Sequence, residues 1–172
     1  LDIAYANKLR GVKIHVLDGE RFALENMNDS ELSAFGDKAR KLKLDVHIET
    51  SASDKKSIDQ AATIALKTGA SSVRFYPRYE GHLQEVMSVI AGDIAYLRDA
   101  YQNSGLTFTI EQHEDLTSHE LVSLIKESGM ESLSLLFDFA NMINANERPL
   151  DALKTMSPHI TQVHIKDALI VQ

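Results

Sequence analysis

Three residues that can bind a metal ion stand where predicted strands end. Glu111 and Asp138 each close an apolar segment, and His164 lies near the end of a third. Two carboxylates and one imidazole suit a divalent cation such as Mn²⁺, Mg²⁺, Co²⁺ or Zn²⁺. Each residue alone has an ordinary explanation, because acidic residues after strands often cap turns and a histidine in an apolar strand usually belongs to the core. Their common position at the ends of three successive segments favours one shared metal site.

Short strand-like segments alternate with helical ones along the chain. Asp29 or Ser30 can cap the first long helix, Thr117 begins a later one, and Pro149 suits the start of another. Residues 133–138 (LSLLFD) form an uninterrupted apolar run, which is typical of a parallel strand buried on both faces. The predicted strands are 11–19, 44–50, 72–76, 106–111, 133–138 and 160–166, and the clearest further helices are 57–68 and 82–103.

This alternation predicts βαβ units and a parallel α/β sheet, which can be an open doubly wound sheet or a closed (β/α)8 TIM barrel. An open dinucleotide-binding sheet needs a glycine-rich turn after its first strand, and residues 17–22 (LDGERF) do not provide one. In a barrel, catalytic residues gather at the carboxyl ends of the strands. The positions of the polar residues therefore favour the barrel.

Three short motifs resemble those of the xylose-isomerase-like TIM barrel superfamily, which includes sugar isomerases, ketose 3-epimerases, dehydratases and abasic-site endonucleases. They are residues 111–115 (EQHED), 137–141 (FDFAN) and 163–167 (VHIKD), of which the last is the most specific. The resemblance extends from about residue 11 onward. It implies a barrel that binds a divalent metal, with Mn²⁺ preferred, and acts on a sugar or polyol.

The resemblance also implies a role for each matching residue. Glu111 would be both a metal ligand and the catalytic acid or base, while Asp138 and His164 would be ligands. Further candidates come from neighbouring positions: His113 and Lys166 would contact substrate or orient the ligands, and Asp167 would hold Lys166 or cap a turn. Arg74, Asn141 and His47 complete the substrate-binding candidates, and Glu49 alternates to the same side of its strand as His47.

The family places these motifs on its fifth, sixth and seventh strands, so that residues 11–19 would be its second strand. The first and eighth strands are then missing, and with them a second glutamate that the eighth strand normally supplies. A complete barrel typically takes about 250 residues, whereas this chain has 172. Residues 1–172 are thus expected to be a single barrel domain that is truncated at both ends of a longer gene product.

The implied reaction is proton transfer through an enediolate, as in a sugar or sugar-phosphate isomerase or epimerase. Two alternatives remain open. The first is a dehydratase of the inosose or dehydroshikimate type, because the same proton abstraction can be followed by loss of a hydroxyl. The second is a barrel that binds a sugar or metal without catalysis. The nuclease branch requires a histidine where this chain has Asn141.

The composition of the chain limits the kinds of partner that the protein is expected to bind. The net charge of −7 disfavours binding to a phosphate backbone, so we expect no nucleic acid partner. The apolar runs are shorter than the roughly 18 residues of a membrane span, so we expect no membrane partner. The chain contains no cysteine, which suits a reducing cytoplasm. Its predicted helical exterior is compatible with a homodimer.

Overall fold

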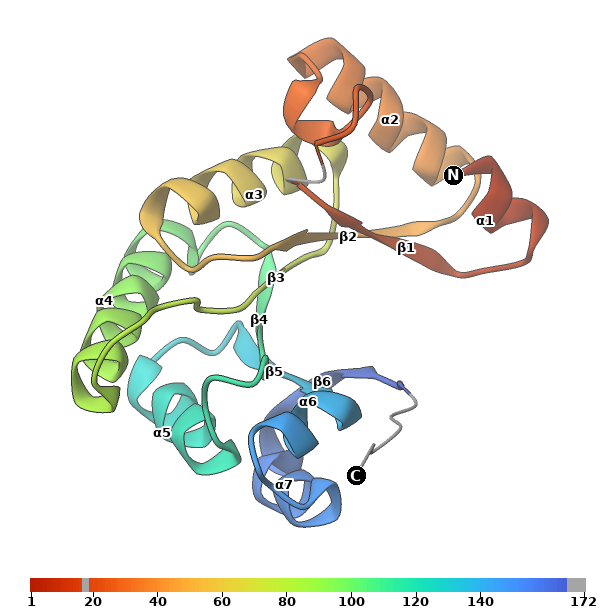
Figure 1. Ribbon diagram of the computed structural model, residues 1–172. Helices are drawn as coiled ribbons and strands as arrows, with labels where there is room; N and C mark the ends of the chain where they lie inside the picture. The colour runs from red at the N-terminus through yellow and green to blue at the C-terminus, as the bar shows by residue number, and fades with distance from the viewer. Residues whose placement is uncertain (17–18, 167–172) are drawn as a thin grey trace.

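Six parallel strands form one curled sheet in the computed structural model, which describes residues 1–16 and 19–166. The strands lie in the sheet in the same order as in the sequence. Helices cover the convex side of the curl, and its concave side is open (Figure 1). The strands are β1 (Gly11–His15), β2 (Asp45–Thr50), β3 (Ser72–Phe75), β4 (Thr107–Glu111), β5 (Leu133–Asp138) and β6 (Ile160–His164).

This architecture is a partial TIM barrel and confirms the predicted fold class. A doubly wound sheet reverses its strand order around the first strand, whereas here each strand pairs in parallel with its neighbours in sequence. Strands β2 to β5 end within one residue of their predicted bounds. In contrast, β1 stops at His15, four residues earlier than expected, and β6 stops at His164, two residues earlier.

The helices connect successive strands on the convex side. They are α1 (Asp2–Ala6), α2 (Asp29–Lys41), α3 (Lys55–Thr68), α4 (Leu83–Tyr101), α5 (Ser118–Ser128), α6 (Phe139–Asn144) and α7 (Pro149–Met156), with short 3-10 turns η1 (Leu24–Asn26) and η2 (Ser157–His159). Thr117 caps α5 in a reciprocal capping box with Glu120, and Pro149 is the first residue of α7, as predicted.

Two helix starts differ from the prediction. The cap of α2 is Asn28 and neither Asp29 nor Ser30, because Asn28 has an extended backbone and its side chain accepts a hydrogen bond from the amide of Glu31. Helix α3 begins two residues before the expected Ser57. Asp54 precedes it, and its carboxylate accepts hydrogen bonds from the amides of Lys56 and Ser57, which fixes the earlier start.

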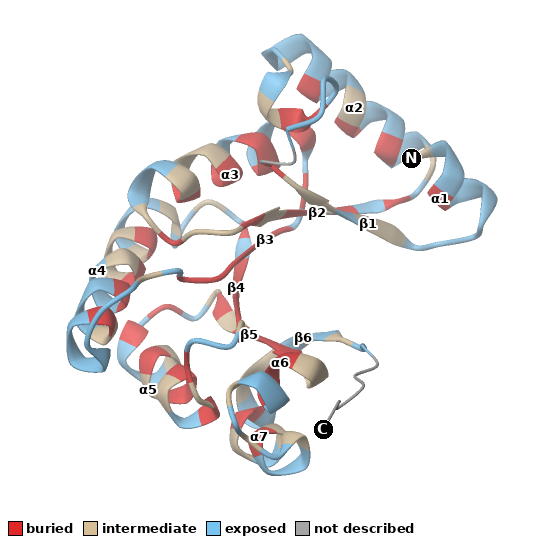
Figure 2. Ribbon diagram, in the orientation of Figure 1, coloured by how far each residue is buried: buried red, intermediate tan, exposed pale blue. Residues whose placement is uncertain are grey.

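The hydrophobic core lies between the convex face of the sheet and the helices, where the buried residues of Figure 2 face each other. Ile48, Val73 and Phe108 are fully buried there, each on a different strand. Successive residues of a strand point to opposite faces. The strand residues between these apolar ones therefore face the concave side, and that side carries the polar candidates.

None of the helices in the described part of the chain is long and apolar enough to cross a membrane.

Candidate metal centre

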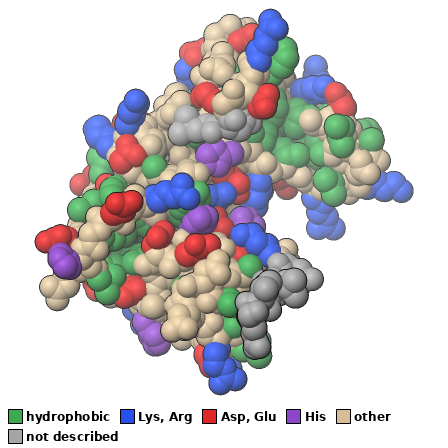
Figure 3. All heavy atoms as spheres, in the orientation of Figure 1, with side chains coloured by type: hydrophobic (Ala, Val, Ile, Leu, Met, Phe, Trp, Pro, Cys, Tyr) green, Lys and Arg blue, Asp and Glu red, His purple; other side chains and the backbone are tan. Residues whose placement is uncertain are grey.

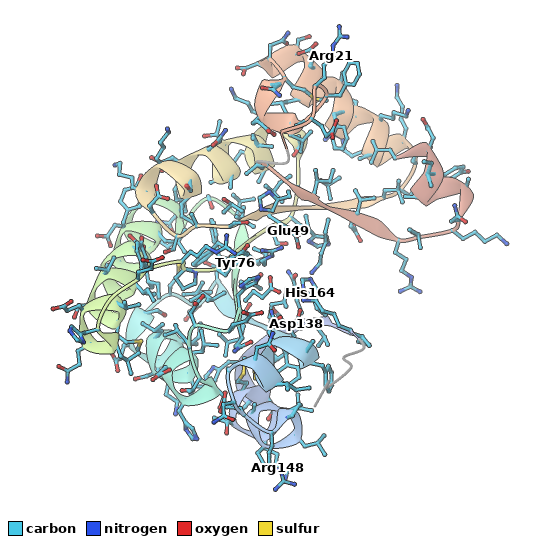
Figure 4. The ribbon with its side chains drawn as sticks, in the orientation of Figure 1. Arg21, Glu49, Tyr76, Asp138, Arg148 and His164 are labelled. Carbon is cyan, nitrogen blue, oxygen red and sulfur yellow. The ribbon has the colours of Figure 1, made fainter. Side chains whose placement is uncertain are left out.

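Glu111, Asp138 and His164 converge on the concave side of the sheet. Each is the last residue of its strand, and parallel strands end at the same edge of a sheet. Nδ1 of His164 lies 3.1 Å from Oε1 of Glu111 and 3.4 Å from Oδ2 of Asp138. One possible ligand atom from each residue lies within 4.8 Å of the other two. Figure 4 shows Asp138 and His164 side by side inside the curl.

The two carboxylates are buried and have one oxygen each without a hydrogen bond. Glu111 is 3% exposed and Asp138 is 0% exposed. Oδ1 of Asp138 accepts hydrogen bonds from the amides of Ala140 and Asn141 and thereby caps α6. Its Oδ2, like Oε2 of Glu111, has no hydrogen-bond partner. Buried anionic oxygens in this state favour a cation. The donor set therefore fits a divalent metal held by Glu111, Asp138 and His164.

Positively charged side chains approach the same oxygens. Nζ of Lys166 lies 2.5 Å from Oδ2 of Asp138, and Nε of Arg74 lies 3.1 Å from Oε2 of Glu111. Both distances are those of ion pairs, but the atoms are not aligned for hydrogen bonds, since neither oxygen has a hydrogen-bond partner. Each contact pairs opposite charges, and a metal at Asp138 would compete with Lys166.

The surroundings of Glu111 favour its ionised form. Burial raises the pKa of this carboxyl, but the hydrogen bond with His164 and the positive charge of Arg74 outweigh burial, so that the pKa lies below its usual value. His113 adds to this lowering through its charge. At neutral pH Glu111 is therefore a carboxylate, as both a metal ligand and a proton acceptor must be.

Two further candidates, His113 and Asn141, follow the ends of β4 and β5. The ring of His113 stacks on Tyr76, with centroids 4.0 Å apart and planes 4° apart. Asn141 is buried, and its amide nitrogen donates a hydrogen bond to the carbonyl of Gln112. Its Oδ1 accepts one from Lys166 at 3.5 Å. Asn141 thus ties the start of α6 to the segment after β4, beside Asp138. Asp167 lies outside the described residues.

His47 is not brought to this site. It lies nearer the amino ends of the strands, where its Nδ1 is 2.6 Å from Oγ of Ser72. A pocket there is shared with Ser134 and Gln162. His47 does face the concave side, but it precedes Glu49 by two residues, which amounts to about 6–7 Å along a strand. This distance separates it from the carboxyl ends, where the metal-binding candidates gather.

Glu49 and Lys13 also reach the site. Glu49 was expected to face the same side of its strand as His47, whereas Lys13 was not predicted. Oε2 of Glu49 accepts a hydrogen bond from Arg74 at 2.7 Å. Nζ of Lys13 lies 3.0 Å from Nε2 of His164 and donates to Gln162 across the open side of the curl. Acidic, basic and histidine side chains gather in this hollow (Figure 3). For Lys13, the available signal was its polar position between the apolar residues 12 and 14.

Residues 9–172 match the family model described as xylose isomerase-like TIM barrel. The chain belongs to this family. It is 82% identical over 172 residues to the protein YihM of Escherichia coli (strain K12), a match that covers 100% of this chain and 53% of YihM. The chain thus spans about half the length of this relative.

Several solved structures share the fold of this chain at low sequence identity. A xylose isomerase domain protein from Planctomyces limnophilus has a TM-score of 0.83 at 17% identity, over 99% of this chain and 68% of its own. A D-psicose 3-epimerase solved with D-fructose has a TM-score of 0.78 at 12% identity, and the match covers 93% of this chain and 64% of the epimerase. A probable 3-DHS dehydratase from Bacillus anthracis has a TM-score of 0.76 at 16% identity, and the match covers 96% of this chain and 66% of the dehydratase. The same fold thus occurs in an epimerase and in a probable dehydratase.

Proposed function

We propose that the complete protein is a divalent-metal-dependent isomerase or epimerase of a sugar or sugar phosphate. The observation that carries this proposal is the convergence of Glu111, Asp138 and His164, with a buried oxygen of each carboxylate lacking a hydrogen bond. Membership of a family that includes epimerase structures supports it. Mn²⁺ is the preferred metal, and the substrate is a small sugar or polyol handled in the cytoplasm.

In the proposed reaction, the residues of the site have separate roles in metal binding, proton transfer and substrate binding. Glu111, Asp138 and His164 would hold the metal, which when bound polarises a carbonyl and a neighbouring hydroxyl and lowers the energy of an enediolate. Glu111 is ionised at neutral pH and can therefore accept the proton next to the carbonyl; only its protonated form can return one. Lys166, which lies beside Asp138, and His113, whose charge acts on Glu111, would contact substrate or orient the ligands.

A dehydratase is the second candidate. The same proton abstraction followed by departure of a hydroxyl on the next carbon gives an elimination. The similarity in fold to a probable 3-DHS dehydratase favours keeping this alternative. Isomerase and dehydratase differ in their products, because elimination forms a carbon–carbon double bond and releases water.

Proton exchange tests the proposal directly. The complete gene product is incubated in heavy water with ketoses, aldoses, inososes and their phosphates, Mn²⁺ is removed, and proton NMR spectra are recorded. We expect loss of the signal of the proton next to a carbonyl, and no such loss with Glu111→Gln. Glu114→Gln is the matched control, because Glu114 is an exposed glutamate of the same motif and its replacement should leave exchange intact.

Three other outcomes of this experiment would contradict the proposal in different ways. Exchange that survives in Glu111→Gln would remove Glu111 from the reaction. A new alkene signal would identify the dehydratase. Absence of exchange with every compound, despite bound Mn²⁺, would favour a barrel that binds its ligand without catalysis.

A further inference from the structure

Four side chains form a closed ring behind the candidate metal centre. His164 contacts Glu111 at 3.1 Å through Nδ1, and its Nε2 faces Oε1 of Glu49 at 3.9 Å. Oε2 of Glu49 accepts a hydrogen bond from Arg74 at 2.7 Å, and Arg74 reaches Glu111 at 3.1 Å. Two members of this ring are candidate metal ligands and two are not. Glu49 and Arg74 thus connect the two candidate ligands, Glu111 and His164, to each other.

The orientation of His164 shows that its Nε2 needs a hydrogen-bond acceptor when a metal is bound. Its Nδ1 faces Glu111 and Asp138 and is therefore the atom that would bind a metal. A neutral imidazole that binds a metal through Nδ1 carries its proton on Nε2. That N–H requires an acceptor, and metal-bound histidines usually donate it to a carboxylate, a carbonyl or water. Lys13, at 3.0 Å from Nε2, is a donor when charged and cannot fill this role.

Glu49 is the acceptor that the surroundings of Nε2 offer. Its Oε1 is buried, has no hydrogen-bond partner and lies 3.9 Å from Nε2. A shift of about 1 Å would bring this pair to hydrogen-bond length. The other oxygen is already fixed by Arg74, so the carboxylate has a defined orientation. Figure 4 shows Glu49 and His164 close together within the curl.

We propose that Glu49 is a positioning residue of the metal centre: its Oε1 accepts the hydrogen bond of the Nε2–H of His164, and Arg74 couples this carboxylate to Glu111. The proposal rests on the proposed metal site and adds to it a residue outside the ligand set. Lys13 then neutralises Glu49, to which its Nζ lies at 3.9 Å. Glu49 thereby sets the affinity for the metal without touching it.

Metal affinity measured on the complete protein tests this role. Titration calorimetry with Mn²⁺ on metal-free protein compares wild type with Glu49→Ala and Glu49→Gln. Loss of such an outer partner typically weakens metal binding about 10- to 100-fold, which we expect for Glu49→Ala. Glu49→Gln keeps the volume and one acceptor oxygen but loses the charge that holds Arg74, so we expect a smaller loss.

Controls separate positioning from simple loss of stability. Glu147→Gln also removes a carboxylate that accepts hydrogen bonds, here from Ser118 at the start of α5, and it should leave Mn²⁺ affinity unchanged. The absorption spectrum of bound Co²⁺ reports the ligand geometry and should change in the Glu49 variants alone. If Glu49→Ala does not fold, Glu49→Gln still decides the question through both measurements.

The possible failures can be told apart. If His164→Ala weakens Mn²⁺ binding but both Glu49 variants bind as wild type does with an unchanged Co²⁺ spectrum, the role of Glu49 is wrong and the metal site stands. If wild type does not bind Mn²⁺, or His164→Ala binds it equally well, the proposed metal site itself fails, and the role of Glu49 fails with it.

Discussion

Replacement of Arg74 by methionine should destabilise the fold strongly, because one guanidinium balances two buried carboxylates. The side chain of Arg74 is 9% exposed, and those of its partners Glu49 and Glu111 are 12% and 3% exposed. Methionine fills similar space but leaves both carboxylates without this cation. Removal of one partner of a buried ion pair typically costs about 3–5 kcal/mol.

A Coulomb estimate agrees with this range. Two unit charges about 4 Å apart interact by about 4 kcal/mol at an effective dielectric constant near 20. The second carboxylate adds to the loss, whereas relaxation and protonation of a carboxyl reduce it. We therefore expect the free energy of unfolding of Arg74→Met to fall by about 4 kcal/mol. A typical domain has about 5–15 kcal/mol, so the variant should still fold at low temperature.

Urea unfolding followed by far-UV circular dichroism at pH 7, with chelator present, measures this loss. Arg148→Met is the matched control, since Arg148 lies on the outside with its side chain 88% exposed (Figure 4). It should change stability by less than about 0.5 kcal/mol. The double variant Arg74→Met/Glu49→Gln removes one of the two carboxylate charges that Arg74 balances and should be more stable than Arg74→Met. A loss below about 1 kcal/mol in Arg74→Met would show that the carboxylates do not depend on this cation, and the electrostatic account of the site would be wrong.

Three further changes test the fold and the metal. Asp54→Ala removes the cap of α3 and should lower the free energy of unfolding in urea by about 1 kcal/mol. The hydrogen bond from Ser57 lowers the pKa of Asp54. The difference in stability between wild type and Asp54→Ala should therefore be present above about pH 4 and vanish as pH falls further. Gly36→Ala would place a Cβ 2.1 Å from the carbonyl oxygen of Thr68, so we expect α2 and α3 to separate at a cost of about 1–3 kcal/mol, seen as a lower Tm. Mn²⁺ at about 100 times its Kd should stabilise wild type by about 2.7 kcal/mol, reversibly on chelation, and should leave the Tm of His164→Ala unchanged.

Local sequence signals sufficed to predict the ends of β4 and β5 and the residues placed there. Glu111 and Asp138 end apolar segments, and this property can be read without any knowledge of distant contacts. Parallel strands then bring their carboxyl ends to one edge whatever the details of packing. A glycine directly after a helical segment is an equally local signal: Gly69 and Gly129 follow α3 and α5 and adopt the left-handed conformation that ends a helix.

The contacts within the concave side depend on strand register, for which the sequence has no local signal. Alternation places His47 and Glu49 on the same face, but the pairing of β2 with β3 sets Glu49 opposite Arg74 and His47 opposite Ser72. A register shifted by two residues would keep the same faces and exchange these partners. The cap of α2 was missed for a related reason: Asn28 and the two residues after it are all competent caps, and the path of the chain from η1 selects among them.

The charged residues of the concave side are better explained by function than by stability. They approach one another in opposite pairs, yet Oε1 of Glu49, Oε2 of Glu111 and Oδ2 of Asp138 are buried without hydrogen bonds. Buried ion pairs with incomplete hydrogen bonding contribute little net stability, and well-packed apolar residues would often serve the fold better. A divalent cation between Glu111 and Asp138, together with a hydrogen bond from His164 to Glu49, would provide a partner for each of these oxygens. The cost of burying these charges therefore points to a site organised around a metal.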